Sequence, residues 1–312
     1  MNFSFFYMSL FLVFFTCEEI SALDPNQNKI GAMMSYNTCR YDANHTRVRL
    51  VKSVSGTILN DWLFLPGGPG VDSSSLIGLV NQMNLPGNYW LVDLIFNGTN
   101  ENYPITSDDV YQLWPRYLEE LVNQFEHPIL VGHSFGGYLP LFCPALEKSL
   151  KGFVIFNSVP TLKSDLFAKI AAEQKLPSLS AVQDAFIREP NLETMKALYL
   201  MEADYFFTKN YRAQGVEQIV NKLEFCIPTE HWWYRNGAGF YAEITWIPQI
   251  TPTLIISGSE DFITPPAVYE QASDFQRENI QMVTIPAAGH FPWLEQPDLV
   301  NHAMKSFLKR CQ

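Results

Sequence analysis

Short runs of apolar and β-branched residues alternate along the chain with longer stretches of helical periodicity. Runs such as Ile129-Leu130-Val131 are continuously apolar, which is typical of strands that helices cover on both faces. The pattern predicts an α/β fold with a mostly parallel central sheet, helices on both faces, and an antiparallel start in which the first two strands pair with each other. Strands are expected at 48–54, 57–65, 89–96, 128–132, 152–157, 253–258 and 281–285, and helices at 107–125 and 297–308.

Residues 159–247 interrupt this alternation. They have mostly helical periodicity and many aromatic side chains, with no convincing strand pattern. An all-helical block between two strands of a parallel sheet predicts a helical cap (159–247) on an α/β core formed by 23–158 and 248–312. Ligands of such sheets bind at the carboxyl edge, which the cap would cover. Trp232 and Trp233 belong to the densest aromatic cluster, and they either line a substrate pocket there or only pack the cap onto the core.

The N-terminus differs from the rest of the chain. Residues 3–15 form an apolar run, and the first basic residue is Lys29. The run is shorter than the roughly 20 residues that a membrane-spanning helix needs, and it suits the apolar region of a signal peptide, although a basic segment before it is missing. We therefore expect 1–22 to be a signal peptide or apolar leader of an exported protein, secreted or periplasmic. The alternatives are an uncleaved anchor, which is the one expected route to a membrane, and a cytoplasmic protein.

Composition and charge narrow the class of partner. The chain has 312 residues and a formal net charge of −11, which argues against a nucleic-acid partner because binding phosphates requires a basic surface. No Cys-x-x-Cys or Cys/His pattern has the spacing of a zinc site, so no metal is expected. We expect mostly free thiols, with a pairing of Cys39 with Cys226 or Cys311 as the alternative after export. The oligomeric state stays open. The scattered cysteines are Cys17, Cys39, Cys143, Cys226 and Cys311.

The strongest chemical motif is Gly132-His133-Ser134-Phe135-Gly136, followed by Gly137. It lies between an expected strand and a helical stretch, which is the context of a G-x-S-x-G nucleophile elbow. The turn is so tight that only small residues fit beside the serine, whose hydroxyl is then exposed above the sheet. The motif predicts that Ser134 is a nucleophile.

This elbow resembles that of the α/β-hydrolase family, in which the acid follows a later strand and the histidine comes last. Asp261 follows a later expected strand in a G-x-x-D-x-x-x-P setting, and His290 follows the last one in Gly-His-Phe-Pro. The resemblance implies a catalytic triad of Ser134, Asp261 and His290. Glu260 is the competing carboxylate for the acid, and His133 is expected to support the turn.

The roles of these residues follow from the weakness of a serine hydroxyl as a nucleophile at neutral pH. His290 is expected to take its proton and later donate it to the leaving group, while Asp261 orients the imidazole. A tetrahedral intermediate needs donors for its oxyanion, and the loss of one donor typically costs ~10²–10³ in rate. The expected donors are the amide of Phe135, which follows Ser134, and the amide of Gly68 in an early turn.

That early turn is Pro66-Gly67-Gly68-Pro69-Gly70, which resembles the H-G-G-P-G turn of proline iminopeptidases and their relatives. Pro66 stands where the relatives have histidine, and Phe96 stands where they commonly have glycine.

Pro140 and Pro144 follow the elbow, and proline disrupts a helix interior. The helix after Ser134 is therefore expected to be short or kinked.

Together these features predict a serine hydrolase that cleaves an ester or amide-type bond through an acyl-enzyme, without metal or organic cofactor. The expected substrate is either a small carboxylic ester or a short peptide with an N-terminal proline. An iminopeptidase needs carboxylates that hold a free amine, and Glu202, Asp204 and Glu230 are candidates by location. The alternatives are a C–C-bond hydrolase and a non-catalytic binding module of the same fold.

Overall fold

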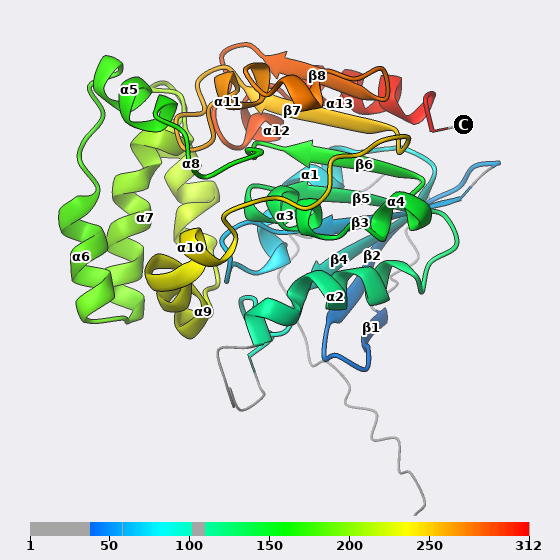
Figure 1. Cartoon of the computed structure of the whole chain (residues 1–312), viewed down its shortest axis with the longest axis horizontal. Coiled ribbons are helices and arrows are strands. Elements are labelled where there is room, and N and C mark those ends of the chain that lie inside the picture. Colours follow the sequence, from blue (N-terminus) through cyan, green and yellow to red (C-terminus); the bar gives the residue numbers. More distant parts are fainter. Residues whose placement is uncertain (1–37, 58, 102–109, 312) are drawn as a thin grey trace, which may run out of the picture. The chain divides into compact units, whose positions relative to one another are not determined.

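One sheet of eight strands, in the order β1-β2-β4-β3-β5-β6-β7-β8, forms the centre of the described residues (Figure 1). The structure is a computed structural model that describes residues 38–57, 59–101 and 110–311. The strands from β4 to β8 in this order pair parallel with one another, whereas β1 pairs antiparallel with β2, and β2 pairs antiparallel with β4. The strands are β1 (Thr38–Tyr41), β2 (Arg47–Val54), β3 (Asn60–Leu65), β4 (Gly87–Asp93), β5 (Pro128–His133), β6 (Gly152–Phe156), β7 (Thr253–Gly258) and β8 (Ile280–Ile285).

Every expected strand is present, but the predicted pairing of the first two strands is wrong. β2 pairs with β1 and β4, whereas β3 lies between β4 and β5 and is parallel to both. The side chains explain the difference. β3 has Trp62, Leu63 and Phe64 fully buried, which suits a central strand. β2 has Arg49 and Lys52 only partly buried, which suits a strand near the edge.

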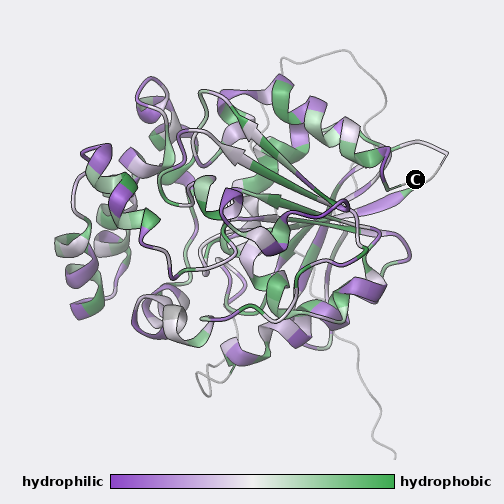
Figure 2. Ribbon diagram, turned by 45° about the horizontal axis from the view of Figure 1, so that its top comes forward, coloured by the Kyte–Doolittle hydropathy of each residue, from purple (hydrophilic) through white to green (hydrophobic). Residues whose placement is uncertain are grey.

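Side chains that alternate along β3 point into two separate cores. Trp62 and Phe64 pack in the cluster on the face of α1 (Ile77–Gln82), α12 (Pro292–Glu295) and α13 (Pro297–Leu308). Leu63 and Leu65 pack in the cluster on the face of α2 (Val110–Val122) and α4 (Leu146–Ser149). Figure 2 shows the central strands as the most continuously hydrophobic part of the ribbon. The sheet is therefore covered on both faces, as predicted.

Between β6 and β7 the described chain forms helices, and we call residues 159–247 the helical segment (Figure 1). One helix of this segment, α7 (Leu192–Phe206), ends beside loops at the carboxyl ends of the strands. There the carbonyl of Phe206 accepts a hydrogen bond from His290 N, and the carbonyl of Tyr205 accepts one from Phe262 N. The helical segment thus contacts the edge of the sheet where ligands are expected. Its helices are α5 (Leu166–Glu173), α6 (Ser180–Arg188), α7 (Leu192–Phe206), α8 (Arg212–Gln218), η3 (Val220–Lys222), α9 (Ile227–Trp232), η4 (Trp233–Gly237) and α10 (Ala238–Phe240).

The expected leader (1–22) and Cys17 lie outside the described residues. Among the helices that are described, none is long and apolar enough to cross a membrane. Cys226 and Cys311 are buried free thiols, so neither forms the disulfide with Cys39 that was considered as an alternative.

Leu130 tests the contribution of the central strand to stability. It is fully buried in β5, so Leu130→Ala is expected to lower the free energy of unfolding by ~2–5 kcal/mol through lost burial and a residual cavity. Leu299→Ala is the matched control, because Leu299 is 42% exposed on α13 and its truncation should cost within ~0.5 kcal/mol. Urea unfolding of both variants measures the difference, and equal midpoints would contradict the assignment of this core.

Candidate active site

Ser134 occupies a strained turn between β5 and the short helix α3 (Phe135–Tyr138). Its φ and ψ are 53° and −121°, a region that non-glycine residues rarely adopt. The backbone is crowded around it: a Cβ atom on Gly132 would collide with the Gly136 carbonyl, and one on Gly136 would collide with the Leu65 carbonyl. The two glycines of the motif are therefore required by the close approach of backbone to backbone, as the sequence predicted.

The helix after Ser134 is short, as its prolines predicted. α3 ends at Tyr138 and continues as the 3₁₀-helix η2 (Leu139–Phe142), which has Pro140 in its first turn. Pro144 lies in the following turn, before α4 begins. One helical turn is nevertheless enough to hold the elbow, because Gly137 N and Tyr138 N both donate to the Ser134 carbonyl.

His290 and Asp261 are brought together from two loops that follow β7 and β8. His290 Nδ1 lies 2.8 Å from Asp261 Oδ2, and both side chains are almost fully buried. The carboxylate of Asp261 also accepts hydrogen bonds from the backbone N–H groups of Ile263 and Thr264, the Thr264 hydroxyl and the Asn157 side-chain amide. Asp261, and not the competing Glu260, therefore contacts the histidine.

These contacts decide the charge of Asp261. Burial acts to raise the pKa of this carboxyl, but the neighbouring His290 and the hydrogen bonds from Thr264 outweigh burial and hold the pKa below its ordinary value. Thr264 and Asn157 were missed in the sequence analysis. The sequence signal for Asn157 is a polar residue directly after the apolar strand β6, which lies beside β5. The structure adds that Asn157 has a left-handed backbone, with φ 44°.

The imidazole of His290 is held between aromatic rings. Phe206 stacks on it with ring centroids 5.3 Å apart, and the His133 ring lies at 4.6 Å. His133 Nε2 is 2.9 Å from the His290 carbonyl, so His133 joins the elbow to the histidine loop, in agreement with its expected supporting position. Burial and the proximity of His290 lower the pKa of His133 well below its ordinary value, which keeps this second imidazole neutral.

Ser134 and His290 line one cavity of about 270 Å³. No hydrogen bond joins the Ser134 hydroxyl to a partner in the described part of the chain, and the residue is open to the cavity. Gly67, Gly68 and Phe135 line the same cavity. Over the described ranges, the amides of these three residues have no protein acceptor, so each is available to an oxyanion. Of the two glycines, Gly67 lies closer to Ser134, since a Cβ atom there would be 2.9 Å from Ser134 Cβ.

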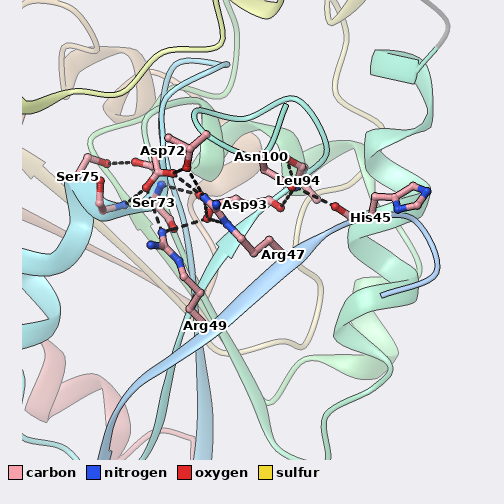
Figure 3. A network of polar contacts seen from close by, with 11 residues as sticks. His45, Arg47, Arg49, Asp72, Ser73, Ser75, Asp93, Leu94 and Asn100 are labelled. Carbon is pink, nitrogen blue, oxygen red and sulfur yellow. Dashed lines mark hydrogen bonds and ion pairs between the residues drawn. The ribbon is translucent and has the colours of Figure 1, made fainter. Parts of the chain in front are cut away.

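The turn that contains these glycines is anchored by a buried ion network at its end (Figure 3). Arg47, on β2, reaches both Asp72 and Asp93 at 2.6 and 2.8 Å, and Arg49 reaches the same two carboxylates. Asp93 Oδ1 in turn accepts from Ser73 N at 2.6 Å. Burial acts to raise the pKa of Asp72, but the two arginines and hydrogen bonds hold it at about 2. The network fixes the turn to β2 and β4.

Phe96 stands where the similar sequences commonly have glycine, and its backbone adopts a conformation that favours glycine. Phe96 has φ 65°, in the left-handed region, and its N–H and carbonyl are bonded to Asn100 O and the Thr229 hydroxyl. The neighbouring Asn97 side chain accepts from Gly70 N at 3.1 Å. The loop thus supports the glycine turn despite the bulky side chain.

The two tryptophans, which were expected either to line a substrate pocket or only to pack the cap onto the core, differ in their positions. Trp233 lines the cavity, with its ring 5.1 Å from that of Phe135. Trp232 is not among the lining residues; it stacks on Tyr111 at 4.4 Å and belongs to the core cluster. Adjacent residues of a helix point in different directions, so only one of the pair faces the cavity.

Two carboxylates of the helical segment face the same cavity. Glu202 on α7 and Glu230 on α9 are 5% and 1% exposed, and among the described residues neither is paired with a Lys or Arg. Burial raises the pKa of Glu202 to about 7 and raises that of Glu230 well above its ordinary value. Asp204, the third carboxylate considered, instead pairs with Arg212 and does not line the cavity. No group of three or more His, Cys, Asp or Glu among the described residues could hold a metal ion.

Arg47 tests the ion network that anchors the glycine turn. Arg47→Met would leave Asp72 and Asp93 buried with one cation instead of two, and we expect the free energy of unfolding to fall by ~3 kcal/mol. Arg116→Met is the control. The side chains of Arg116 and its ion-pair partner Glu120 are 60% and 49% exposed, so this pair should contribute at most ~1 kcal/mol. Urea unfolding compares them, and a similar small loss in both variants would show that the network stabilises little.

Comparisons with known proteins agree with this fold. Solved structures of similar fold include a thermophilic esterase from Thermogutta terrifontis (19% identity, TM-score 0.60, 85% of this chain and 94% of that chain). A proline iminopeptidase of Mycobacterium smegmatis matches at 17% identity and TM-score 0.58, over 88% and 98% of the two chains. An alpha/beta fold family hydrolase from Bacillus anthracis matches at 14% identity and TM-score 0.62, over 86% and 99%.

At such identities these structures support the fold alone. No curated protein matches the sequence significantly. The sequence model described as "Alpha/beta hydrolase family", in contrast, matches residues 62–303, which include the elbow, both loops of the Asp–His pair and the whole helical segment. The chain therefore belongs to the alpha/beta hydrolase family.

Proposed function

We propose that the protein is a serine hydrolase that removes an N-terminal residue with a free amine, such as proline, from a short peptide or amide. One observation supports this choice above the others: the two buried carboxylates Glu202 and Glu230 line the same cavity as Ser134 and His290. Unpaired buried carboxylates are costly unless a cation compensates them, and a substrate ammonium group is such a cation.

In the first half of the reaction, Ser134 Oγ attacks the carbonyl carbon of the substrate while His290 Nε2 takes its proton. Asp261 stabilises the imidazolium through the 2.8 Å contact with Nδ1. The negative charge on the tetrahedral oxygen is stabilised by the amides of Phe135 and of the glycine turn, with Gly68 as the predicted donor and Gly67 beside it. His290 then gives its proton to the leaving amine, and an acyl-enzyme remains.

In the second half, water takes the place of the leaving amine. His290 removes a proton from the water, the hydroxide attacks the acyl carbon, and the same amides again hold the oxyanion. Collapse of the intermediate returns the proton from His290 to Ser134 and releases the free carboxylic acid. The strained backbone at Ser134 keeps its Oγ atom in the cavity, as a hydroxyl before the reaction and as the ester oxygen of the acyl-enzyme.

The helical segment supplies the specificity in this proposal. Glu202 and Glu230 lie on different helices and would hold the substrate ammonium between them. Trp233 and Phe135 would pack on the apolar part of the bound residue. A cavity of about 270 Å³ suits one small residue, so the rest of a peptide would extend away from it.

A second candidate is hydrolysis of a small carboxylic ester. The raised pKa values of Glu202 and Glu230 favour protonated, uncharged carboxyls when no cation is bound. A neutral acyl group could then occupy the cavity without a charge mismatch. The chemistry at Ser134 is the same for both substrates, so substrate preference distinguishes the candidates.

The triad is tested by Ser134→Ala and Asp261→Asn. Ser134→Ala is expected to abolish labelling by a fluorophosphonate probe, and Asp261→Asn to lower kcat by ~10⁴ because the imidazole loses its orienting partner. Ser178→Ala is the matched control, since Ser178 is exposed and, within the described ranges, its hydroxyl bonds only to Ser180. Full labelling of a folded Ser134→Ala protein would refute the proposed nucleophile.

The amine site is tested by Glu202→Gln and Glu230→Gln. Each variant should raise KM for proline β-naphthylamide by ~10-fold or more, because an ion pair in a buried site is replaced by a neutral contact. Hydrolysis of p-nitrophenyl acetate should change little. Asp204→Asn is the matched control, because Asp204 is two residues from Glu202 but pairs with Arg212.

Three outcomes separate the candidates. A loss confined to the naphthylamide supports amine recognition. Rapid turnover of p-nitrophenyl esters with no cleavage of aminoacyl naphthylamides would favour the esterase. Equal losses on both substrates would mean that the two carboxylates act on the fold of the cavity and not on the substrate amine.

A further inference from the structure

Two tyrosines cross-link the carboxylates of the cavity. The Tyr199 hydroxyl donates to Glu230 Oε1 at 3.1 Å, and the Tyr234 hydroxyl donates to Glu202 Oε1 at 3.0 Å. Tyr199 and Glu202 are three residues apart on α7, whereas Glu230 and Tyr234 are four residues apart across α9 and η4, so each pair lies on one helical face. Each helix therefore supplies one carboxylate and the donor for the other carboxylate.

The hydrogen bonds are directed at one oxygen of each carboxylate only. In the residues that the structure describes, no donor contacts Oε2 of Glu202 or of Glu230, and neither atom is completely buried. Both side chains line the cavity, as do both tyrosines. A carboxylate that is held at Oε1 and free at Oε2 has a defined orientation and one oxygen available to a ligand.

We propose that Tyr199 and Tyr234 are positioning residues that orient Glu230 and Glu202 so that their free oxygens meet on the ammonium group of the substrate. This inference rests on the amine-binding function proposed above and extends it to residues that do not themselves touch the ammonium. The crossed arrangement makes the distance between the two carboxylates depend on both helices, so the pair acts as one site.

The tyrosines also affect the charge of the pair. Burial is the main cause of the raised pKa of each glutamate, and the tyrosine hydrogen bond opposes it by stabilising the ionised form. Burial and the nearby glutamates raise the pKa values of Tyr199 and Tyr234 well above the ordinary value, so both remain protonated donors. Other ionisable groups that line the cavity are His133, His290 and Tyr138, and the charge of Glu202 contributes to a raised pKa of Tyr205.

The test uses the full chain with Tyr199→Phe and Tyr234→Phe, which keep the buried rings and remove only the hydroxyl groups. Each is expected to raise KM for proline β-naphthylamide by about tenfold, since one hydrogen bond to a charged group is lost, with kcat little changed. Turnover of p-nitrophenyl acetate should stay within about twofold of the wild type. Tyr211→Phe is the matched control, because its hydroxyl bonds to the exposed Gln218 and not to either glutamate.

A pH profile separates positioning from a general structural role. For the wild type, the ratio of kcat/KM on the naphthylamide to kcat/KM on the ester should rise as pH increases through about 7, because Glu202 must ionise to bind the amine. Without its tyrosine donor the pKa of Glu202 rises further, so Tyr234→Phe should move this rise to higher pH. A variant that merely loosens the fold would lower both activities and leave the midpoint of the ratio in place.

The outcomes distinguish this inference from the function on which it rests. If the wild type does not cleave aminoacyl naphthylamides, or if Glu202→Gln and Glu230→Gln cleave them normally, the amine-binding function and the inference both fail. If the glutamate variants lose amine discrimination while both tyrosine variants keep the KM and pH profile of the wild type, only the positioning role is overturned. A KM increase together with the shifted midpoint supports both.

Discussion

The close approach of backbone to backbone around Ser134 is the constraint on which the rest of the site depends. The carboxyl end of β5, the first turn of α3 and the turn after β3 are packed so tightly that neither Gly132 nor Gly136 can have a side chain. This contact places Ser134 and Phe135 at the cavity and sets the glycine turn directly against Ser134. Because these segments are in close backbone contact, the interactions that anchor the neighbouring loops also fix the position of Ser134.

Those anchors are polar, and none of them is Ser134, Asp261 or His290. The Arg47–Asp72–Asp93 network anchors the end of the glycine turn. Glu295 accepts hydrogen bonds from Gly289 N and Thr208 N, which joins the histidine loop to the helical segment. Buried charges need close partners, and Arg47 with Asp72 and Asp93, like Glu295 with Thr208, joins residues that are far apart in the chain. The site is therefore assembled by long-range contacts, although its motifs are short and local.

The helical segment is hydrogen-bonded to the loops that contain Asp261 and His290. His290 N donates to Phe206 O, and the Phe206 ring stacks on the imidazole. Glu202 lies one helical turn before Phe206 on α7, so the carboxylate and the histidine are connected through a single rigid helix. This connection gives a physical reason why substrate recognition and acid–base chemistry would share one geometry.

The sequence by itself indicated the strands from β2 to β8, the sharp turn at Ser134 and the positions of Asp261 and His290 after later strands, because periodicity, proline, glycine and motif spacing act over a few neighbouring residues. It also predicted the short helix before Pro144. Only the tertiary structure decided that β3 lies between β4 and β5, that Trp233 and not Trp232 faces the cavity, and that Glu202 and Glu230 lie there while Asp204 does not. Each of these depends on which surfaces of distant segments pack together. Packing of that kind is set by the complementarity of whole elements, which a local pattern along one chain does not contain.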